Sequence, residues 1–182
     1  MVINCNSTTI DLSEGHVMGV LNVTPDSFYD GGKYKDLNVI VTHAKQMLED
    51  GATFIDIGGA STKPGADDVD EMEEINRVIP AINAIKQHVP KAIISIDTTS
   101  SVVAEKAVAS GASIVNDISA GTFDDRMLAV VASLGVPYIA MHIQGTPKTM
   151  QKKPTYKNVV DDVFRTMETF RDRAIKKGIQ QI

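Results

Sequence analysis

The fold is decided by the stretch Gly51-Ala52-Thr53-Phe54-Ile55-Asp56-Ile57, whose plan the chain uses more than once. A glycine suited to end a helix comes first, a small residue follows, and an apolar strand then carries a polar residue near its far end. Residues 111–117 and 135–142 follow the same plan. This repetition predicts a fold in which strands alternate with helices.

Further strands and helices are predicted around these repeats. Apolar runs indicate two more strands, at residues 17–23 and 92–97, and a looser alternation over residues 2–12 indicates a short hairpin ahead of them. Apolar residues at helical spacing predict helices that include Ile40 to Leu48, Ile75 to Ile85, Val102 to Ala107, Met127 to Leu134 and Val159 to Phe170. The strands are almost continuously apolar, which is typical of a parallel sheet covered on both faces.

The alternation favours an α/β fold of the (β/α)8 TIM-barrel type over a dinucleotide-binding sheet, because no G-x-G-x-x-G follows the first strand. Five strand–helix units can be counted, and residues 178–182 repeat the opening of a strand. Barrels of this type typically need roughly 200 residues or more. We therefore expect residues 1–182 to be a single barrel domain, truncated after about five units, with strands 6–8 absent.

The composition is that of an ordinary globular protein, with 43% hydrophobic and 23% charged residues. A net charge of −5 argues against a nucleic acid or an anionic membrane as partner. The single cysteine, Cys5, cannot form an internal disulfide, and the chain shows neither a signal-peptide pattern nor a membrane-spanning apolar run. We therefore expect a cytoplasmic protein.

Polar side chains stand at the ends of the predicted strands: Asn22, Asp56, Asp97, Asn116 with Asp117, and His142. These ends share one face of a parallel sheet, where barrels place their catalytic and binding residues. Each residue alone can equally be a helix cap or a turn residue. Five such strands in succession favour a ligand site, and residues 98–101 can cap the next helix without Asp97.

The residue types at these ends suit a nitrogen heterocycle with an amino-pyrimidinone edge, because carboxylates and amides accept and donate hydrogen bonds in a plane. Met141 can pack against a flat ring or fill a gap in the core. The loop at residues 58–66 combines glycines, hydroxyls and Lys63, which suits a phosphate. The four histidines do not form a zinc cluster, and His142 can be a ligand group or a loop entry.

Two long runs resemble signatures of the dihydropteroate synthase family. They are Gly19-Val20-Leu21-Asn22-Val23-Thr24-Pro25-Asp26-Ser27-Phe28, followed by Asp30-Gly31-Gly32, and Asp56-Ile57-Gly58-Gly59-Ala60-Ser61-Thr62-Lys63-Pro64-Gly65. Residues 95–98, 115–118 and 141–145 match later family segments in order. The family is a folate-pathway transferase on a TIM barrel, which joins 6-hydroxymethyl-7,8-dihydropterin diphosphate to 4-aminobenzoate and releases pyrophosphate.

The resemblance implies a role for each matched position. Asp56 and Asp97 would be the catalytic residues, and Asn22 would help to hold Mg²⁺ and the diphosphate. The substrate-binding residues implied are Thr62, Asp97, Asn116, Ile118, Met141, Phe28, Ser61, Lys63 and Pro64. Among them, Thr62 and Lys63 would contact the diphosphate, and the loops with Phe28 and Pro64 would close over the aminobenzoate, where sulfonamides compete.

The chain also departs from the family pattern. Ala60 stands where the family usually has Glu, and Lys63 stands where it has Arg, so the bidentate fork of the guanidinium is lost. The family's binding residues on strands 6 to 8 and the helices of its usual homodimer would lie beyond Ile182. On this basis we expect the isolated 182-residue chain to be inactive.

Two other functions stay open. A pterin-binding barrel that transfers a methyl group from methyltetrahydrofolate to a corrinoid shares the pterin-binding Asp and Asn, but residues 24–28 argue against it. A non-catalytic pterin-binding or interaction module is the second alternative. An open barrel would expose strand edges and apolar surface, which is unfavourable for such a module.

Overall fold

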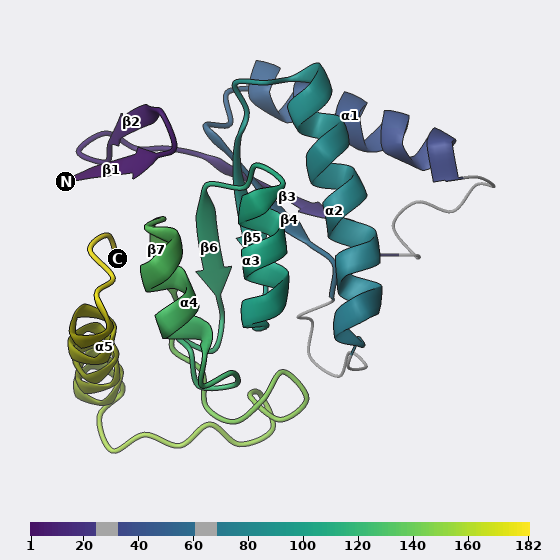
Figure 1. Cartoon of the computed structure of the whole chain (residues 1–182). Helices are drawn as coiled ribbons and strands as arrows, with labels where there is room; N and C mark the ends of the chain where they lie inside the picture. The colour runs from purple at the N-terminus through teal and green to yellow at the C-terminus, as the bar shows by residue number, and fades with distance from the viewer. Residues whose placement is uncertain (25–32, 61–68) are drawn as a thin grey trace.

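A computed structural model describes residues 1–24, 33–60 and 69–182, with side chains from residue 37 onward in the second segment. One parallel sheet contains, in chain order, β3 (Met18–Asn22), β4 (Phe54–Gly58), β5 (Ile93–Asp97), β6 (Ile114–Asp117) and β7 (Tyr138–Ala140). The helices that follow these strands are α1 (Lys33–Glu49), α2 (Glu71–His88), α3 (Ser101–Ala109), α4 (Met127–Leu134) and α5 (Val159–Lys177). Five consecutive βα units confirm the predicted α/β fold (Figure 1).

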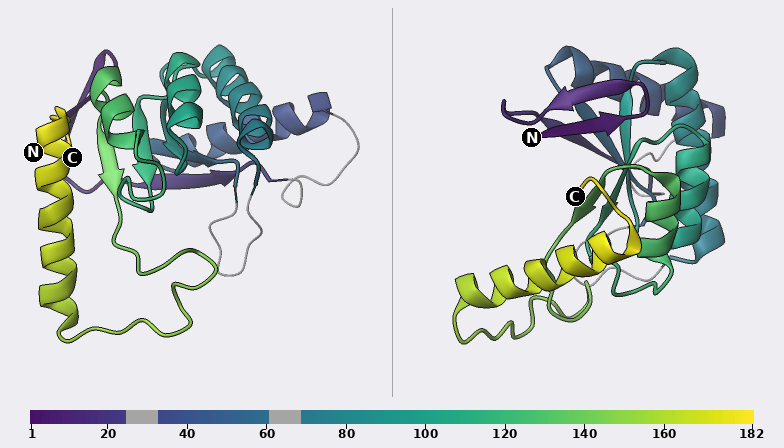
Figure 2. Two further views of the ribbon diagram at one scale, coloured as in Figure 1. Left: turned by 60° about the horizontal axis from the view of Figure 1, so that its bottom comes forward. Right: turned by 60° about the vertical axis from the view of Figure 1, so that its left-hand side comes forward.

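Helices α1 to α4 lie side by side along one face of the sheet, and α5 stands beside α4 at its edge (Figure 2). Alternate strand residues such as Leu21, Ile55 and Ile94 point toward these helices and are fully buried. On the opposite face, Val20 and Ile139 are 57% and 39% exposed. The expectation of cover on both faces is therefore not met in the described part of the chain, where helices cover one face only.

The glycines that end the helices behave as the repeat predicts. Gly135 ends α4 and Gly178 ends α5, and both have a positive φ, of 66° and 99°, which few residues other than glycine adopt readily. The strand predicted at residues 178–182 is not formed, although Tyr138 N donates a hydrogen bond to Gln181 O at 2.9 Å. The segment after α5 thus runs beside β7 without joining the sheet as a regular strand.

The predicted N-terminal hairpin is confirmed as β1 (Val2–Cys5) paired antiparallel with β2 (Thr8–Asp11). Ile3 and Cys5 pack against the first residues of β4, β5 and β6, so the hairpin covers the amino ends of the strands. It also lies close to the C-terminal residues, where Asn4 N donates to Gln181 Oε1 at 2.6 Å (Figure 2). Burial raises the pKa of the Cys5 thiol, which suits a structural role.

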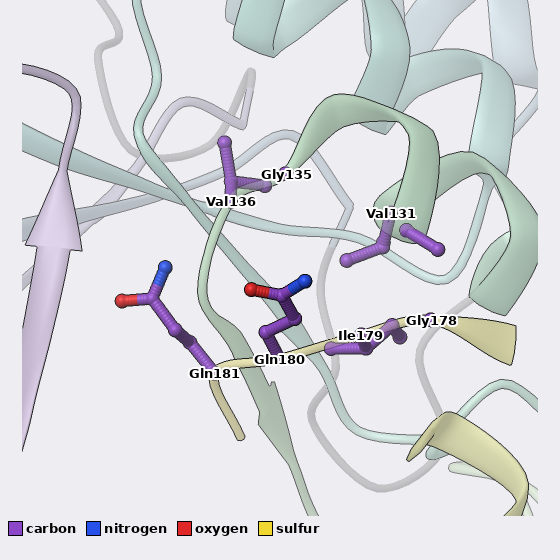
Figure 3. Close-up of a pocket in the computed structure, with 8 residues that line it drawn as sticks. Val131, Gly135, Val136, Gly178, Ile179, Gln180 and Gln181 are labelled. Carbon is purple, nitrogen blue, oxygen red and sulfur yellow. The ribbon is translucent and has the colours of Figure 1, made fainter. Parts of the chain in front are cut away.

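The described helices include none with the length and apolar character that crossing a bilayer requires. A cavity of about 140 Å³ lies between the end of α4 and the residues that follow α5 (Figure 3). Its lining includes Val131, Val136 and Ile179, with backbone from Gly135 and Gly178. Val136 precedes β7, so this cavity lies away from the carboxyl ends of the strands.

Candidate active site

The register of the sheet brings the predicted polar residues together. Asn22 is paired with Gly58, Gly58 with Asp97, and Asp97 with Asn116, which forms one row across four strands. Asp56 lies two residues before Gly58 and therefore on the same face of the sheet. The carboxyl ends of β3, β4, β5 and β6 thus meet in a single site on the face that the helices leave open.

The polar residues of the strand ends could instead cap helices. However, the three side-chain caps that the structure describes are formed by other residues. Those caps are Asp70 for α2, Ser100 for α3 and Asn158 for α5. Ser100 Oγ accepts the hydrogen bond from Val103 N at 3.3 Å, as residues 98–101 predict. Asp97 is therefore free of capping α3 and can serve a ligand.

Two carboxylates in this site, Asp56 and Asp97, carry buried oxygens without a hydrogen-bond donor in the described part of the chain. Asn116 Nδ2 donates to Asp56 Oδ2 at 3.0 Å and fixes one oxygen of that carboxylate. Among the described residues, Asp56 Oδ1 and Asp97 Oδ1 are buried and have no partner. A buried acceptor left without a donor is costly in a native protein. The two unpaired oxygens therefore indicate a ligand that supplies N–H donors.

The electrostatics of the site point the same way. Burial, and to a smaller extent the nearby carboxylates of Asp56, Glu74 and Asp117, together raise the pKa of Asp97 to about 7. Burial also raises the pKa of Asp56, although the nearby Ser95 hydroxyl and, to a smaller extent, the hydrogen bond from Asn116 oppose this effect. A ligand that donates hydrogen bonds would favour the ionised carboxylates and offset the cost of their burial.

Asn22 lies at the solvent-exposed side of the same row. A Cβ atom placed on Gly58 would lie 3.3 Å from Asn22 Oδ1 and 3.5 Å from Asp97 Oδ2, so the glycine leaves a space between them. The described residues contain no group of three or more His, Cys, Asp or Glu that would hold a metal alone. An exposed amide oxygen fits Mg²⁺, which commonly keeps several waters and takes few ligands from the protein itself.

A family model described as pterin binding enzyme matches residues 18–182 of the chain. The chain belongs to this family. It is 40% identical over 181 residues to the dihydropteroate synthase of Haemophilus influenzae, with 100% of this chain and 65% of that protein covered. The chain therefore spans less than two thirds of the length of this relative.

Solved structures of similar proteins agree with the fold of this chain. The dihydropteroate synthase of Yersinia pestis, in a sulfonamide drug complex, has a TM-score of 0.90 and 41% identity, with 99% of this chain and 65% of that chain covered. The Xanthomonas albilineans enzyme in complex with 7,8-dihydropteroate has a TM-score of 0.84 and 34% identity, covering 99% and 62% of the two chains. Both likenesses extend along almost the whole of this chain.

The remaining predicted residues have different outcomes. Ile118 is half-buried directly after β6, and Met141, directly after β7, is 41% exposed. His142 Nε2 lies 3.2 Å from Tyr156 Oη in the loop that follows, whereas His142 Nδ1 is buried and has no described partner, so both interpretations of His142 stay open. Predicted positions outside the described residues are Phe28, Ser61, Thr62, Lys63 and Pro64.

Asp117 departs from the expectation that every polar strand end faces the ligand. Neighbouring residues of a strand point to opposite faces, so Asn116 faces the site and Asp117 faces the helix layer. Its side chain is fully buried and accepts hydrogen bonds from two backbone amides and one hydroxyl. The prediction of Asp117 as a possible ligand group was therefore wrong.

The sequence interpretation did not single out Glu74, a buried carboxylate in the first turn of α2. Burial raises the pKa of Glu74. The next turn of the helix carries Arg77, whose Nη1 donates to the Gly59 carbonyl at 2.8 Å. The sequence signal that could have identified Glu74 is its place directly before Ile75, which belongs with Val78 to the apolar stripe of the helix. The amino end of α2 thus fixes the backbone just after β4.

Gly59→Ala should destabilise the protein, because the added methyl group has no space. Its Cβ would lie 2.7 Å from Val78 Cγ1 and 3.2 Å from the Glu74 backbone oxygen. We expect the free energy of unfolding in urea to fall by about 1–3 kcal/mol. Gly15→Ala is the matched control, since a Cβ there meets nothing within 4 Å. Equal stability of the two variants would contradict the close packing of β4 on α2.

Proposed function

We propose that the whole protein is a dihydropteroate synthase of folate biosynthesis. It would join 6-hydroxymethyl-7,8-dihydropterin diphosphate to 4-aminobenzoate and give 7,8-dihydropteroate and pyrophosphate. The observation that carries the proposal is the pair of unpaired, buried carboxylate oxygens on Asp56 and Asp97 in one site. The names of the relatives and the 7,8-dihydropteroate bound to the Xanthomonas albilineans enzyme support it.

Asp97 and Asn116 are proposed to read the amino-pyrimidinone edge of the pterin. That edge presents adjacent N–H donors, which suit the free oxygen of Asp97. The Asn116 side chain is oriented by its bond to Asp56, so the amide and both carboxylates face the ligand as one group. Ile118 and Met141 would pack against the flat ring.

The proposed reaction needs no covalent bond to the protein. The bond between the methylene carbon and the diphosphate oxygen breaks, and the electron-rich dihydropterin ring stabilises the resulting cation. The aminobenzoate nitrogen then bonds to this carbon and loses a proton. The chain's own residues hold the pterin ring at a fixed depth, so that the methylene group is positioned for the amine.

Mg²⁺ is proposed as the cofactor, with Asn22 as its protein ligand beside the diphosphate. When bound, it would act as a Lewis acid on the leaving oxygens. Small-molecule substrates, a cytoplasmic location and a homodimer complete the proposal. The free, buried thiol of Cys5 supports a reducing compartment.

The proposal is tested by incubating the whole protein, and not residues 1–182 alone, with Mg²⁺, the dihydropterin diphosphate and 4-aminobenzoate. We expect 7,8-dihydropteroate and pyrophosphate in equal amounts, the first measured by mass spectrometry and the second by a phosphate assay after hydrolysis with pyrophosphatase. Pterin binding without product would instead support a non-catalytic module. Methyl transfer from methyltetrahydrofolate to a corrinoid, with no dihydropteroate, would support the other family of pterin-binding barrels.

Asn22→Ala should raise the Mg²⁺ concentration needed for half-maximal activity by about tenfold. The variant removes the exposed amide oxygen at the end of β3 and leaves the buried carboxylates in place. The measurement is a Mg²⁺ titration of the initial rate at saturating substrates. Asn38→Ala, at an exposed position on α1, serves as the control and should leave the titration unchanged. An identical titration for Asn22→Ala would remove Asn22 from the metal site.

A further inference from the structure

The Asp117 side chain accepts three hydrogen bonds. Because Asp117 is the neighbour of Asn116 in the chain, these bonds bear on the position of Asn116 in the site. The Asp117 side chain is fully buried on the helix side of β6. Its Oδ1 accepts from Ser119 N at 2.7 Å, and its Oδ2 accepts from Gly121 N at 2.8 Å. Tyr138 Oη also donates to Oδ2, at 2.5 Å. Both oxygens of this carboxylate are therefore used within the protein.

The loop that Asp117 holds has an unfavourable backbone. Ala120 has a φ of 51° and Gly121 a φ of 68°, and the left-handed region is costly for a residue with a side chain. A Cβ at Gly121 would also lie 2.9 Å from Leu128 Cγ, so the turn is packed closely on α4. The hydrogen bonds from the backbone N–H groups of Ser119 and Gly121 to the Asp117 carboxylate offset this cost and keep the loop in one conformation.

The same residue connects β6 to both ends of β7. Tyr138, which is 1% exposed, begins β7, and its ring stacks on Phe170 of α5 with centroids 5.6 Å apart. At the other end of β7, Met141 N donates to the Asp117 carbonyl oxygen at 3.4 Å. Burial and the adjacent Asp117 carboxylate raise the pKa of the Tyr138 hydroxyl, so it stays a donor.

We propose that Asp117 is a positioning residue for the pterin. It fixes its chain neighbours Asn116 and Ile118 through the loop, and it fixes Met141 through its carbonyl group. These three residues are the ones proposed to contact the pterin ring, so the inference rests on the proposed function. Loss of the Asp117 carboxylate would release the loop and weaken binding of the pterin, without direct contact between Asp117 and the ligand.

The test compares Asp117→Asn and Tyr138→Phe with the natural protein in titrations with 6-hydroxymethylpterin, followed by pterin fluorescence. Asp117→Asn should raise the Kd about tenfold, because a carboxylate that accepts three hydrogen bonds is replaced by an amide. Tyr138→Phe removes one donor and should raise the Kd about threefold. The KM for the pterin diphosphate should rise in parallel, and the KM for 4-aminobenzoate should stay within about twofold.

Val131→Ala is the control for a general loss of stability, because Val131 is fully buried on α4 and lies outside the loop. It should lower the thermal midpoint and leave the pterin Kd unchanged. An unchanged Kd for Asp117→Asn would overturn the inference, whatever the change in stability. If Asp117→Asn does not fold, Tyr138→Phe decides: a raised Kd supports the inference and an unchanged Kd overturns it. Absence of pterin binding by the natural protein would overturn the proposed function instead.

Discussion

Asp97→Asn should lower kcat/KM for the dihydropterin diphosphate by about 10³-fold or more. The carboxylate oxygen that lacks a partner in the site would become part of a neutral amide. Such an amide either presents its NH₂ group to the N–H donors of the pterin or accepts from one of them only weakly. The loss should appear in pterin binding as well, measured by fluorescence titration with 6-hydroxymethylpterin.

The same substitution should stabilise the empty protein at pH 8, which separates loss of function from loss of fold. The pKa of Asp97 is about 7 in the folded chain against an ordinary value of 3.8, so folding becomes less favourable as the pH rises from about 4 to 7. Removing this ionisable group should raise the free energy of unfolding at pH 8 by about 1–3 kcal/mol.

Asp50→Asn is a suitable control for Asp97→Asn, because Asp50 is exposed after α1, at the opposite end of the strands. It should change neither the stability nor the kinetics. Full activity of Asp97→Asn, or a loss of stability that accounts for its inactivity, would contradict the role given to Asp97.

The fold could be predicted because the chain marks its units by local chemistry. Glycines such as Gly135 and Gly178 end helices at a positive φ, and an apolar strand follows Gly135. The helix cap at Ser100 could also be predicted, because the hydroxyl residues 98–101 directly precede the apolar residues of α3. Residues 178–182 show the limit of this method, because they lie beside β7 and accept a backbone hydrogen bond from Tyr138 N but do not form the regular ladder of a strand.

The candidate site was predictable in its members but not in their directions. Asn116 and Asp117 are adjacent, and only the register of β6 decides which of them faces the ligand. Glu74 was missed because acidic residues in the first turn of a helix usually stay in solvent, where they interact with the helix dipole. Its burial depends on the close approach of Gly59 to α2, which is a tertiary contact.

The affinity for pterin should rise with pH up to about 7 and then level off. The amino-pyrimidinone edge donates hydrogen bonds, so it needs Asp97 in its ionised, accepting form. The pKa of Asp97 in the empty site is about 7, because burial and then the carboxylates of Asp56, Glu74 and Asp117 disfavour the charge. Below that pH, binding must release a proton, and the affinity should fall by up to about tenfold per pH unit.

The measurement is the Kd of 6-hydroxymethylpterin between pH 5.5 and 8.5, with Asp97→Asn as the matched variant. The variant should bind weakly at every pH, without the rise, because it lacks the titrating group. Glu74→Gln tests the cause more finely: it removes one of the charges that raise the pKa of Asp97, so the midpoint of the rise should move below pH 7. A Kd of the natural protein that is constant over this range would contradict an ionised Asp97 as the acceptor of the pterin. A rise that persists in Asp97→Asn would assign the titration to a neighbour such as Asp56.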